Sequence, residues 1–238
     1  MGTVSAVAFA LDGSTALQFA VIKKPHDYAR IYFADEVNKA LLVQTWNDPH
    51  INKAISVSDK YIIYESGQNA RDLHNALKTM GYKEALQAFR QVIEGVIAYQ
   101  SKGYFHGDIK EPNVIIFDTP NGPKVQLIDN SPISGKDLKQ GKISSWISTP
   151  GYSDNVIGLK IINDPNVDYH AIDSFSLGVI AKNIGKKFGA NYGTKSILDI
   201  SDLMQNPDIS GKEDFLPSLL LKIDNLIAHS PDTAQKAA

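Results

Sequence analysis

The residues best suited to do chemistry lie in two neighbouring segments, residues 106–113 (HGDIKEPN) and residues 127–129 (LID). The acidic and basic side chains of these segments have complementary abilities. An aspartate can accept the proton of a hydroxyl group, a lysine can neutralise a phosphoryl group in transfer, and Asn and Asp oxygens suit Mg²⁺. The set predicts phosphoryl transfer, and the alternative is a polar loop between two strands that happens to carry acids.

Composition is that of an ordinary globular protein. The 238 residues suit one domain or two small lobes, with 43% hydrophobic and 21% charged residues. A formal net charge of -2 argues against a nucleic-acid partner held by bulk electrostatics. Cysteine is absent, which excludes disulfides and thiolate metal sites and fits a reducing compartment. No apolar run approaches the roughly 18 residues that span a bilayer, so we expect no membrane span.

The elements that must position the reactive residues are strands first and helices later. Strands are predicted at residues 4–9, 17–23, 51–57, 60–65, 114–117 and 125–128, with a hairpin turn at Asp12 and Gly13. Helices are predicted at residues 26–46, near Asp72, at residues 82–101 and from Asp173 to the C-terminus. One face of the first helix is expected to carry Tyr32, Val37, Leu41 and Leu42. The apolar stripe expected on residues 82–101 consists of Phe89, Val92, Ile93, Val96, Ile97 and Tyr99. Residues 131–148, rich in Gly, Ser and Lys, are predicted to form a mobile loop. This order indicates an α+β fold in which a small sheet-bearing lobe precedes a mainly helical lobe.

With this order in place, the chain resembles the protein kinase family along nearly its whole length. Residues 106–113 resemble the H-x-D-x-K-x-x-N catalytic loop, residues 127–129 lead into a D-F-G-like metal-binding segment, and residues 20–23 (AVIK) resemble the V-A-I-K strand. The resemblance implies a bilobal kinase-like fold over residues 1–238, with an N-lobe at 1–66 and a C-lobe at 67–238. It also implies ATP and Mg²⁺ as cofactors.

The resemblance assigns roles to the residues of the catalytic loop. Asp108 would orient the acceptor hydroxyl and accept its proton, and Lys110 would neutralise the transferred phosphoryl group. Asn113 and Asp129 would hold the metal ion.

A second set of residues would hold the nucleotide. Lys23 would pair with the phosphates, with Lys24 as the alternative. Glu36 would pair with Lys23 and hold it in place, with Asp35 as the competing acid.

The adenine pocket would take its residues from several elements. Gly2, Thr3 and Val4 would be what remains of the glycine-rich loop, with Val4 against the nucleotide. Tyr64 would occupy the gatekeeper position, residues 65–67, starting with Glu65, would line the adenine edge, and Ile115 would floor the pocket.

Two downstream segments resemble those of kinases that act on Ser and Thr of proteins. Residues 148–152 (STPGY) resemble the segment that receives a peptide, with Thr149 bonded to the Asp108–Lys110 pair. Residues 169–179 (YHAIDSFSLGV) resemble the D-x-W-S-L-G-V helix start, in which Asp173 would be a buried acid that tethers the catalytic loop. An exposed helix cap is the alternative for Asp173. The implied partner is a protein substrate.

Four departures from the kinase pattern stand out. The preceding strand and most of the glycine-rich loop are missing, through truncation or natural reduction. Gly107 replaces an Arg that meets a phosphorylated loop, so control by loop phosphorylation is less expected. Asn130 and Ser131 replace the Phe and Gly of D-F-G, and residues 153–155 (SDN) replace A-P-E.

Two alternative functions are consistent with these residues. His106, Gly107 and Asp108 fit a small-molecule kinase of the aminoglycoside phosphotransferase type, although Lys110 and residues 148–152 favour a protein kinase. The reduced glycine-rich loop favours a pseudokinase that acts as a binding module. The compact chain is similar to effector kinases that bacteria or viruses deliver into host cells. We therefore expect a cytoplasmic protein, located in the host cytosol if it is an effector. An activating protein partner is also consistent with the sequence.

Overall fold

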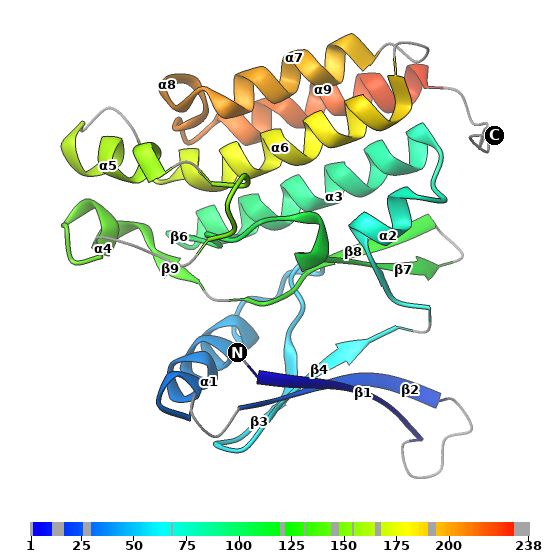
Figure 1. The fold of residues 1–238 in the computed structure, drawn as a ribbon, viewed down its shortest axis with the longest axis vertical. Coiled ribbons are helices and arrows are strands. Elements are labelled where there is room, and N and C mark those ends of the chain that lie inside the picture. The colour runs from blue at the N-terminus through cyan, green and yellow to red at the C-terminus, as the bar shows by residue number, and fades with distance from the viewer. Residues whose placement is uncertain are drawn as a thin grey trace.

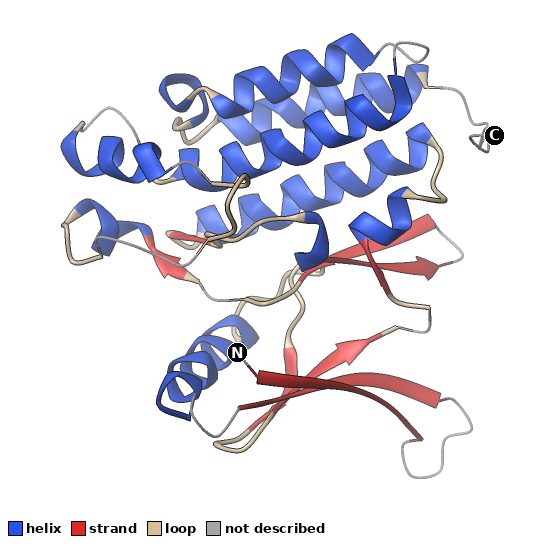
Figure 2. Cartoon of the chain, viewed as in Figure 1, coloured by secondary structure: helices blue, strands red, loops and turns tan. Residues whose placement is uncertain are grey.

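The computed structural model describes residues 2–10, 17–25, 30–67, 69–119, 122–130, 132–143, 148–153, 155–164, 168–189 and 194–230. The mixture of helix and sheet expected from the sequence is confirmed, with strands concentrated in the first half and helices in the second (Figure 2). The turn expected at Asp12 and Gly13 lies outside the described residues. Within the described residues, no helix combines the length and the apolar character that crossing a bilayer requires.

A four-stranded antiparallel sheet forms one end of the molecule (Figure 1). Its strands are β1 (Gly2–Ala10), β2 (Leu17–Pro25), β3 (Ala54–Val57) and β4 (Ile62–Ser66), in the order β1-β2-β4-β3. Helix α1 (Arg30–Gln44) packs on this sheet, where Phe33 and Ala40 join Ala54 and Ile62 in a small buried cluster. The buried side chains of Ala54 on β3 and Ile62 on β4 provide part of the face that this helix covers.

Helices form the other end, around the long helix α3. The helices are α3 (Tyr82–Ser101), α5 (Asn155–Asn163), α6 (His170–Phe188), α7 (Thr194–Gln205), α8 (Pro207–Ser210) and α9 (Phe215–His229). The apolar stripe predicted for α3 is buried at Phe89, Val92, Ile93, Val96 and Tyr99. Helices α6 and α9 both pack on α3, so this stripe lies at the centre of the main core.

Short strands and helices lie between the two ends (Figure 1), and the loops that join them carry Asp108, Lys110 and Asp129. These elements are β5 (Arg71–Asp72), α2 (Leu73–Leu77), β6 (Tyr104–Phe105), the 3-10 helix η2 (Glu111–Asn113), β7 (Val114–Thr119), β8 (Gly122–Leu127), β9 (Ile133–Ser134) and α4 (Gly135–Lys139). The antiparallel pair β7 and β8 places the segments before Val114 and after Leu127 side by side. This hairpin is the reason that the two reactive segments meet.

Two expectations from the sequence were wrong. The mobile loop predicted for residues 131–148 contains strand β9, which pairs with β6, and helix α4, which Ser134 caps through a hydrogen bond to Asp137 N. Residues 131 and 144–147 of that stretch lie outside the described residues. Leu41, expected on the apolar face of the first helix, is exposed on α1. Leu42, expected on the same face, packs against the main core.

Candidate active site

Asp108 and Lys110 form the centre of the site together with Thr149. The Lys110 ammonium lies 2.7 Å from Asp108 Oδ2 and 2.7 Å from the Thr149 hydroxyl. The Thr149 hydroxyl and backbone N–H donate to Asp108 Oδ1 at 2.7 and 3.0 Å. The bond between Thr149 and the Asp108–Lys110 pair, expected from the sequence, is therefore present.

Asn113 ends the 3-10 helix η2 and faces the same aspartate. Its Nδ2 donates to the backbone carbonyl of Asp108 at 2.8 Å and to Asp108 Oδ2 at 3.1 Å. These two bonds orient the amide, so its oxygen is the atom directed away from Asp108. A carbonyl-type oxygen is a suitable ligand for Mg²⁺.

Lys23 and Asp129 form a second charged group. Lys23 Nζ lies 3.1 Å from Glu36 Oε2, which is the ion pair expected from the sequence. It also lies 2.9 Å from Asp129 Oδ1, a contact that the sequence did not predict. Lys24 is exposed, and Asp35 pairs with Lys39 at 2.7 Å, so the structure separates both alternatives from this group. Burial would lower the pKa of Lys23, but the carboxylates of Asp129 and Glu36 raise it above its usual value.

The electrostatics of Asp129 connect the two groups. Burial alone would raise the pKa of Asp129, but the Lys23 ammonium, and more weakly His106 and Lys110, hold it below its usual value. Asp129 is therefore a carboxylate at neutral pH, the form that binds a cation. Among the described residues no cluster of three or more His, Asp or Glu side chains could hold a metal ion. An Asp and an Asn nevertheless fit Mg²⁺, which takes one or two carboxylates and fills its shell with water and substrate phosphates.

The backbone around Asp129 is unusual. Its φ angle is 58°, in the left-handed region that residues other than glycine rarely adopt. Such a conformation costs about 1–3 kcal/mol and persists only where surrounding contacts hold it. Ile128, just before it, donates its N–H to the Asn113 carbonyl at 2.9 Å, and the Ile128 carbonyl lies 3.0 Å from His106 Nε2.

Asp173 anchors the candidate catalytic loop from helix α6. Its carboxylate is fully buried and accepts the backbone N–H groups of His106 and Gly107 at 2.7 and 2.9 Å. This arrangement is the tether expected from the sequence, and it excludes the exposed-cap alternative. Burial raises the pKa of Asp173, and the two backbone hydrogen bonds and His106 oppose that rise. Gly107 has a φ of 81°, a conformation that glycine adopts without strain.

The residues expected around adenine lie on strands β1, β4 and β7. Val4 is opposite Lys23 in the register of β1 and β2, and its side chain lies outside the described part of the structure. Glu65 is exposed on β4, and its carbonyl accepts a hydrogen bond from Asn52 at 2.9 Å. Ile115 is half-buried on β7. Tyr64 is also half-buried, and desolvation raises its pKa to about 12.

Sequence reasoning missed two buried polar groups beside the site. Asn130 is hydrogen-bonded to Tyr99 of α3 and to Asn52 of the loop after α1. Glu111, 2% exposed, accepts hydrogen bonds from Tyr152 and, at 2.8 Å, from Asn183 of α6. For Asn130 the sequence signal was its place in the position where the kinase pattern has a Phe.

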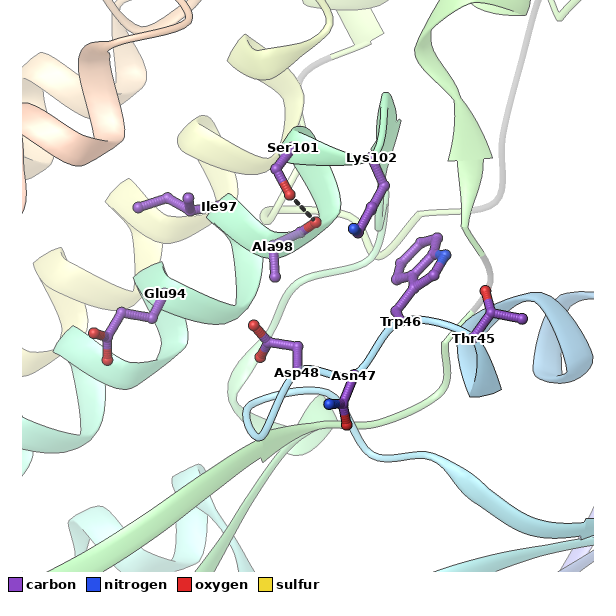
Figure 3. Close-up of a pocket in the computed structure, with 9 residues that line it drawn as sticks. All are labelled: Thr45, Trp46, Asn47, Asp48, Glu94, Ile97, Ala98, Ser101 and Lys102. Carbon is purple, nitrogen blue, oxygen red and sulfur yellow. Dashed lines mark hydrogen bonds between the residues drawn. The ribbon is translucent and has the colours of Figure 1, made fainter.

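A separate cavity of about 370 Å³ lies between the end of α1 and helix α3 (Figure 3). Its lining residues are Thr45, Trp46, Asn47, Asp48, Glu94, Ile97, Ala98, Ser101 and Lys102. None of the candidate site residues lines it. The Glu94 carboxylate is already paired with Arg90 at 2.7 Å. This cavity is not the candidate active site.

The chain is similar in sequence to curated protein kinases, although no family model matches it. It is 26% identical over 189 residues to CBL-interacting protein kinase 3 of Oryza sativa subsp. japonica, covering 75% of this chain and 41% of that protein. It is 28% identical over 182 residues to eukaryotic translation initiation factor 2-alpha kinase 3 of Bos taurus, covering 72% and 16%.

A shorter match has higher identity. The chain is 34% identical over 95 residues to serine/threonine-protein kinase pim-2 of Danio rerio, covering 39% of this chain and 29% of that protein. In each of these matches the aligned part spans less than half of the relative's length. These similarities agree with the buried anchor at Asp173 and the Asp108–Lys110–Thr149 cluster, and together they support a relationship to the protein kinase family.

Proposed function

We propose that this protein transfers the terminal phosphoryl group of ATP to Ser or Thr hydroxyls of a protein substrate. The observation that carries the proposal is the convergence of Asp108, Lys110 and Thr149, which come from two segments about forty residues apart in sequence. A carboxylate, an ammonium and a hydroxyl within hydrogen-bond distance of each other supply a proton acceptor and a counter-charge at one point.

In the proposed reaction Asp108 orients the acceptor hydroxyl and accepts its proton, and Lys110 neutralises charge on the transferred group. Lys23, held by Glu36, binds the phosphates of ATP. Mg²⁺ bound by Asp129 and Asn113 would supply charge neutralisation on those phosphates. Rate enhancement would come from positioning and electrostatics more than from any nucleophile of the protein.

The adenine ring would lie between the four-stranded sheet and the β7–β8 hairpin, against Val4, Glu65 and Ile115. The pairing of β1 with β2 supports this placement, because it puts residue 4 opposite Lys23. We further propose that strands β1–β4 with α1 correspond to a reduced N-lobe over residues 1–66, and that residues 67–238 form the C-lobe.

Peptide acceptors are favoured over small molecules by the placement of Thr149. Residues 149–152 are fixed at both ends, by Thr149 on Asp108 and by Tyr152 on Glu111 and Ser176. A fixed backbone segment beside the proton acceptor is suited to align an extended peptide. The glycine at position 107 is the observation that favours the aminoglycoside-type alternative.

The proposal is tested by phosphate transfer from radiolabelled ATP in the presence of Mg²⁺. Wild-type protein and Asp108→Asn are compared on a generic protein substrate and on Ser, Thr and Tyr peptides, with aminoglycosides and sugars in parallel. We expect transfer to Ser or Thr peptides that falls at least about a hundredfold in Asp108→Asn. Equal transfer by both proteins contradicts the proposal that the protein is an enzyme and favours a pseudokinase. Transfer to small molecules alone favours a small-molecule kinase of the aminoglycoside phosphotransferase type.

A further inference from the structure

We propose, building on the proposed function, that Asn130 is a positioning residue whose side-chain amide holds the neighbouring Asp129 in its metal-binding conformation. Asn130 occupies the position next to the acid where the kinase pattern has a Phe. The bridge made by its amide is a feature of the structure itself, whereas the metal role of Asp129 belongs to the proposed function.

The Asn130 amide joins two elements that are far apart in sequence. Its Nδ2 donates to the Asn52 carbonyl at 2.5 Å, in the loop between α1 and β3. Its Oδ1 accepts the Tyr99 hydroxyl of α3 at 2.6 Å. The side chain is 5% exposed, so both bonds lie away from water. A buried amide in such a pair of directional bonds has one orientation.

Asp129 lies between two residues, Ile128 and Asn130, that are each fixed by hydrogen bonds. On one side, the backbone of Ile128 is bonded to Asn113 and lies against His106 of the catalytic loop. On the other side, the side chain of Asn130 is fixed between Asn52 and Tyr99. The left-handed backbone of Asp129, with φ 58°, is uncommon for a non-glycine residue and persists where surrounding contacts hold it.

Tyr99 is itself rigidly placed. It is completely buried and packs edge-to-face against Trp46 at a centroid distance of 5.0 Å. Burial raises the pKa of its hydroxyl well above the usual value, so it remains a proton donor at all physiological pH values. The hydroxyl is therefore a permanent donor to Asn130 Oδ1.

The bridge also extends toward the adenine side of the site. Asn52, which accepts the bond from Asn130, donates its own Nδ2 to the Glu65 carbonyl at 2.9 Å and to Gln126 Oε1 at 3.0 Å. One asparagine thus connects strand β4, strand β8 and the residue after Asp129. The hydrogen bonds of Asn130 thus take the place of the apolar packing that a Phe makes at this position of the kinase pattern. In the proposal they hold Asp129 in place.

The test compares Asn130→Leu, which keeps the size but loses both bonds, with the milder Tyr99→Phe, which loses one. Ser201→Ala is the matched control, because its buried hydroxyl donates to the Gly178 carbonyl at 2.8 Å between α6 and α7. Hydrogen–deuterium exchange of the peptide around residues 127–130 is measured on nucleotide-free protein. Mn²⁺ binding in the presence of ADP is measured by electron paramagnetic resonance, and ADP binding without metal by calorimetry.

We expect exchange at residues 127–130 to rise on the order of tenfold in Asn130→Leu and less in Tyr99→Phe. Mn²⁺ affinity falls by a similar factor, and ADP affinity without metal is unchanged. The double variant behaves like Asn130→Leu alone, because the two residues share one bond. Ser201→Ala loses overall stability without either local effect.

Unchanged exchange in Asn130→Leu and Tyr99→Phe overturns the positioning role, and so does an equal increase in Ser201→Ala. If Asn130→Leu does not fold, Tyr99→Phe alone decides between these outcomes. Wild-type protein that transfers no phosphate contradicts the proposed function, while the exchange measurement still decides whether Asn130 holds Asp129. Wild-type protein that binds no Mn²⁺ with ADP overturns the metal half of the inference.

Discussion

Thr149 donates both its hydroxyl and its backbone N–H to a single oxygen of Asp108, at 2.7 and 3.0 Å. The other Asp108 oxygen receives Lys110 at 2.7 Å and Asn113 at 3.1 Å. The carboxylate that would accept the proton is thus oriented by three side chains and one backbone amide. Its orientation depends on a segment that is remote in sequence.

Loss of the Thr149 hydroxyl should impair catalysis more than folding. Thr149→Val keeps the shape and the backbone N–H but removes the hydroxyl from Asp108 and Lys110. We expect kcat/KM for a peptide to fall about ten- to a hundredfold, the range of one positioned hydrogen bond at a reacting group. Steady-state kinetics measure this effect, and Thr149→Ser, which keeps the hydroxyl, should recover most of the activity. Full activity in Thr149→Val would refute the orienting role.

Removal of the negative charge at Asp173 should destabilise the protein. Asp173→Asn replaces one of the two oxygens that accept the His106 and Gly107 amides by a donor, so a buried backbone N–H loses its partner. We expect the free energy of unfolding to fall by about 2–3 kcal/mol, measured by urea denaturation. Asp224→Asn is the control, because its partner Arg90 is on the surface and exposed pairs contribute about 1 kcal/mol or less. Equal effects in both variants would contradict the anchor.

Loss of the hydrogen bond from Tyr152 to Glu111 should weaken binding of the peptide acceptor but not of ATP. The carboxylate joins Tyr152, in the segment proposed to receive the peptide, to Asn183 of α6, and the Tyr152 carbonyl accepts the Ser176 hydroxyl at 2.6 Å. In Tyr152→Phe the segment loses one of its attachments, so we expect a rise of about tenfold in KM for the peptide with KM for ATP unchanged. Kinetics with each substrate varied in turn provide the measurement. Parallel changes in both KM values would indicate a general loss of structure instead.

His170 should make the fold sensitive to acid. Burial lowers the pKa of His170 below its usual value of 6.5, while Asp168 and Glu213 oppose the shift. Neither ring nitrogen has a hydrogen-bond partner among the described residues. Below pH 6.5 the unfolded chain is protonated at this histidine before the folded protein is, so the free energy of unfolding falls as pH decreases toward the folded pKa.

A variant that is neutral at every pH isolates this contribution. His170→Gln should show a smaller loss of unfolding free energy between pH 7 and pH 5 than the wild type, measured by urea denaturation at each pH. His229→Gln, on the exposed end of α9, is the matched control and should follow the wild type. A wild-type slope in His170→Gln would show that other groups cause the acid sensitivity.

Much of the fold followed from local pattern. Helix α3 has the bounds that its apolar periodicity predicted, residues 82–101, because one continuous stripe faces the core. The segment after Asp129 was not predictable in the same way. Strand β9 and helix α4 are short and polar, and β9 depends on pairing with β6, some thirty residues earlier. Local propensity carries little signal for elements that long-range pairing stabilises.

The sequence alone determined which residue types could perform the chemistry, because the spacing within residues 106–113 fixes a single loop that carries Asp108, Lys110 and Asn113. Only the tertiary structure decided that Lys23 rather than Lys24 meets Glu36, since successive side chains of a strand point to opposite faces. The bond between Asn52 and Asn130 likewise joins residues 78 positions apart. Such a contact depends on how the sheet, α1 and α3 pack together, and no periodicity in the chain encodes it.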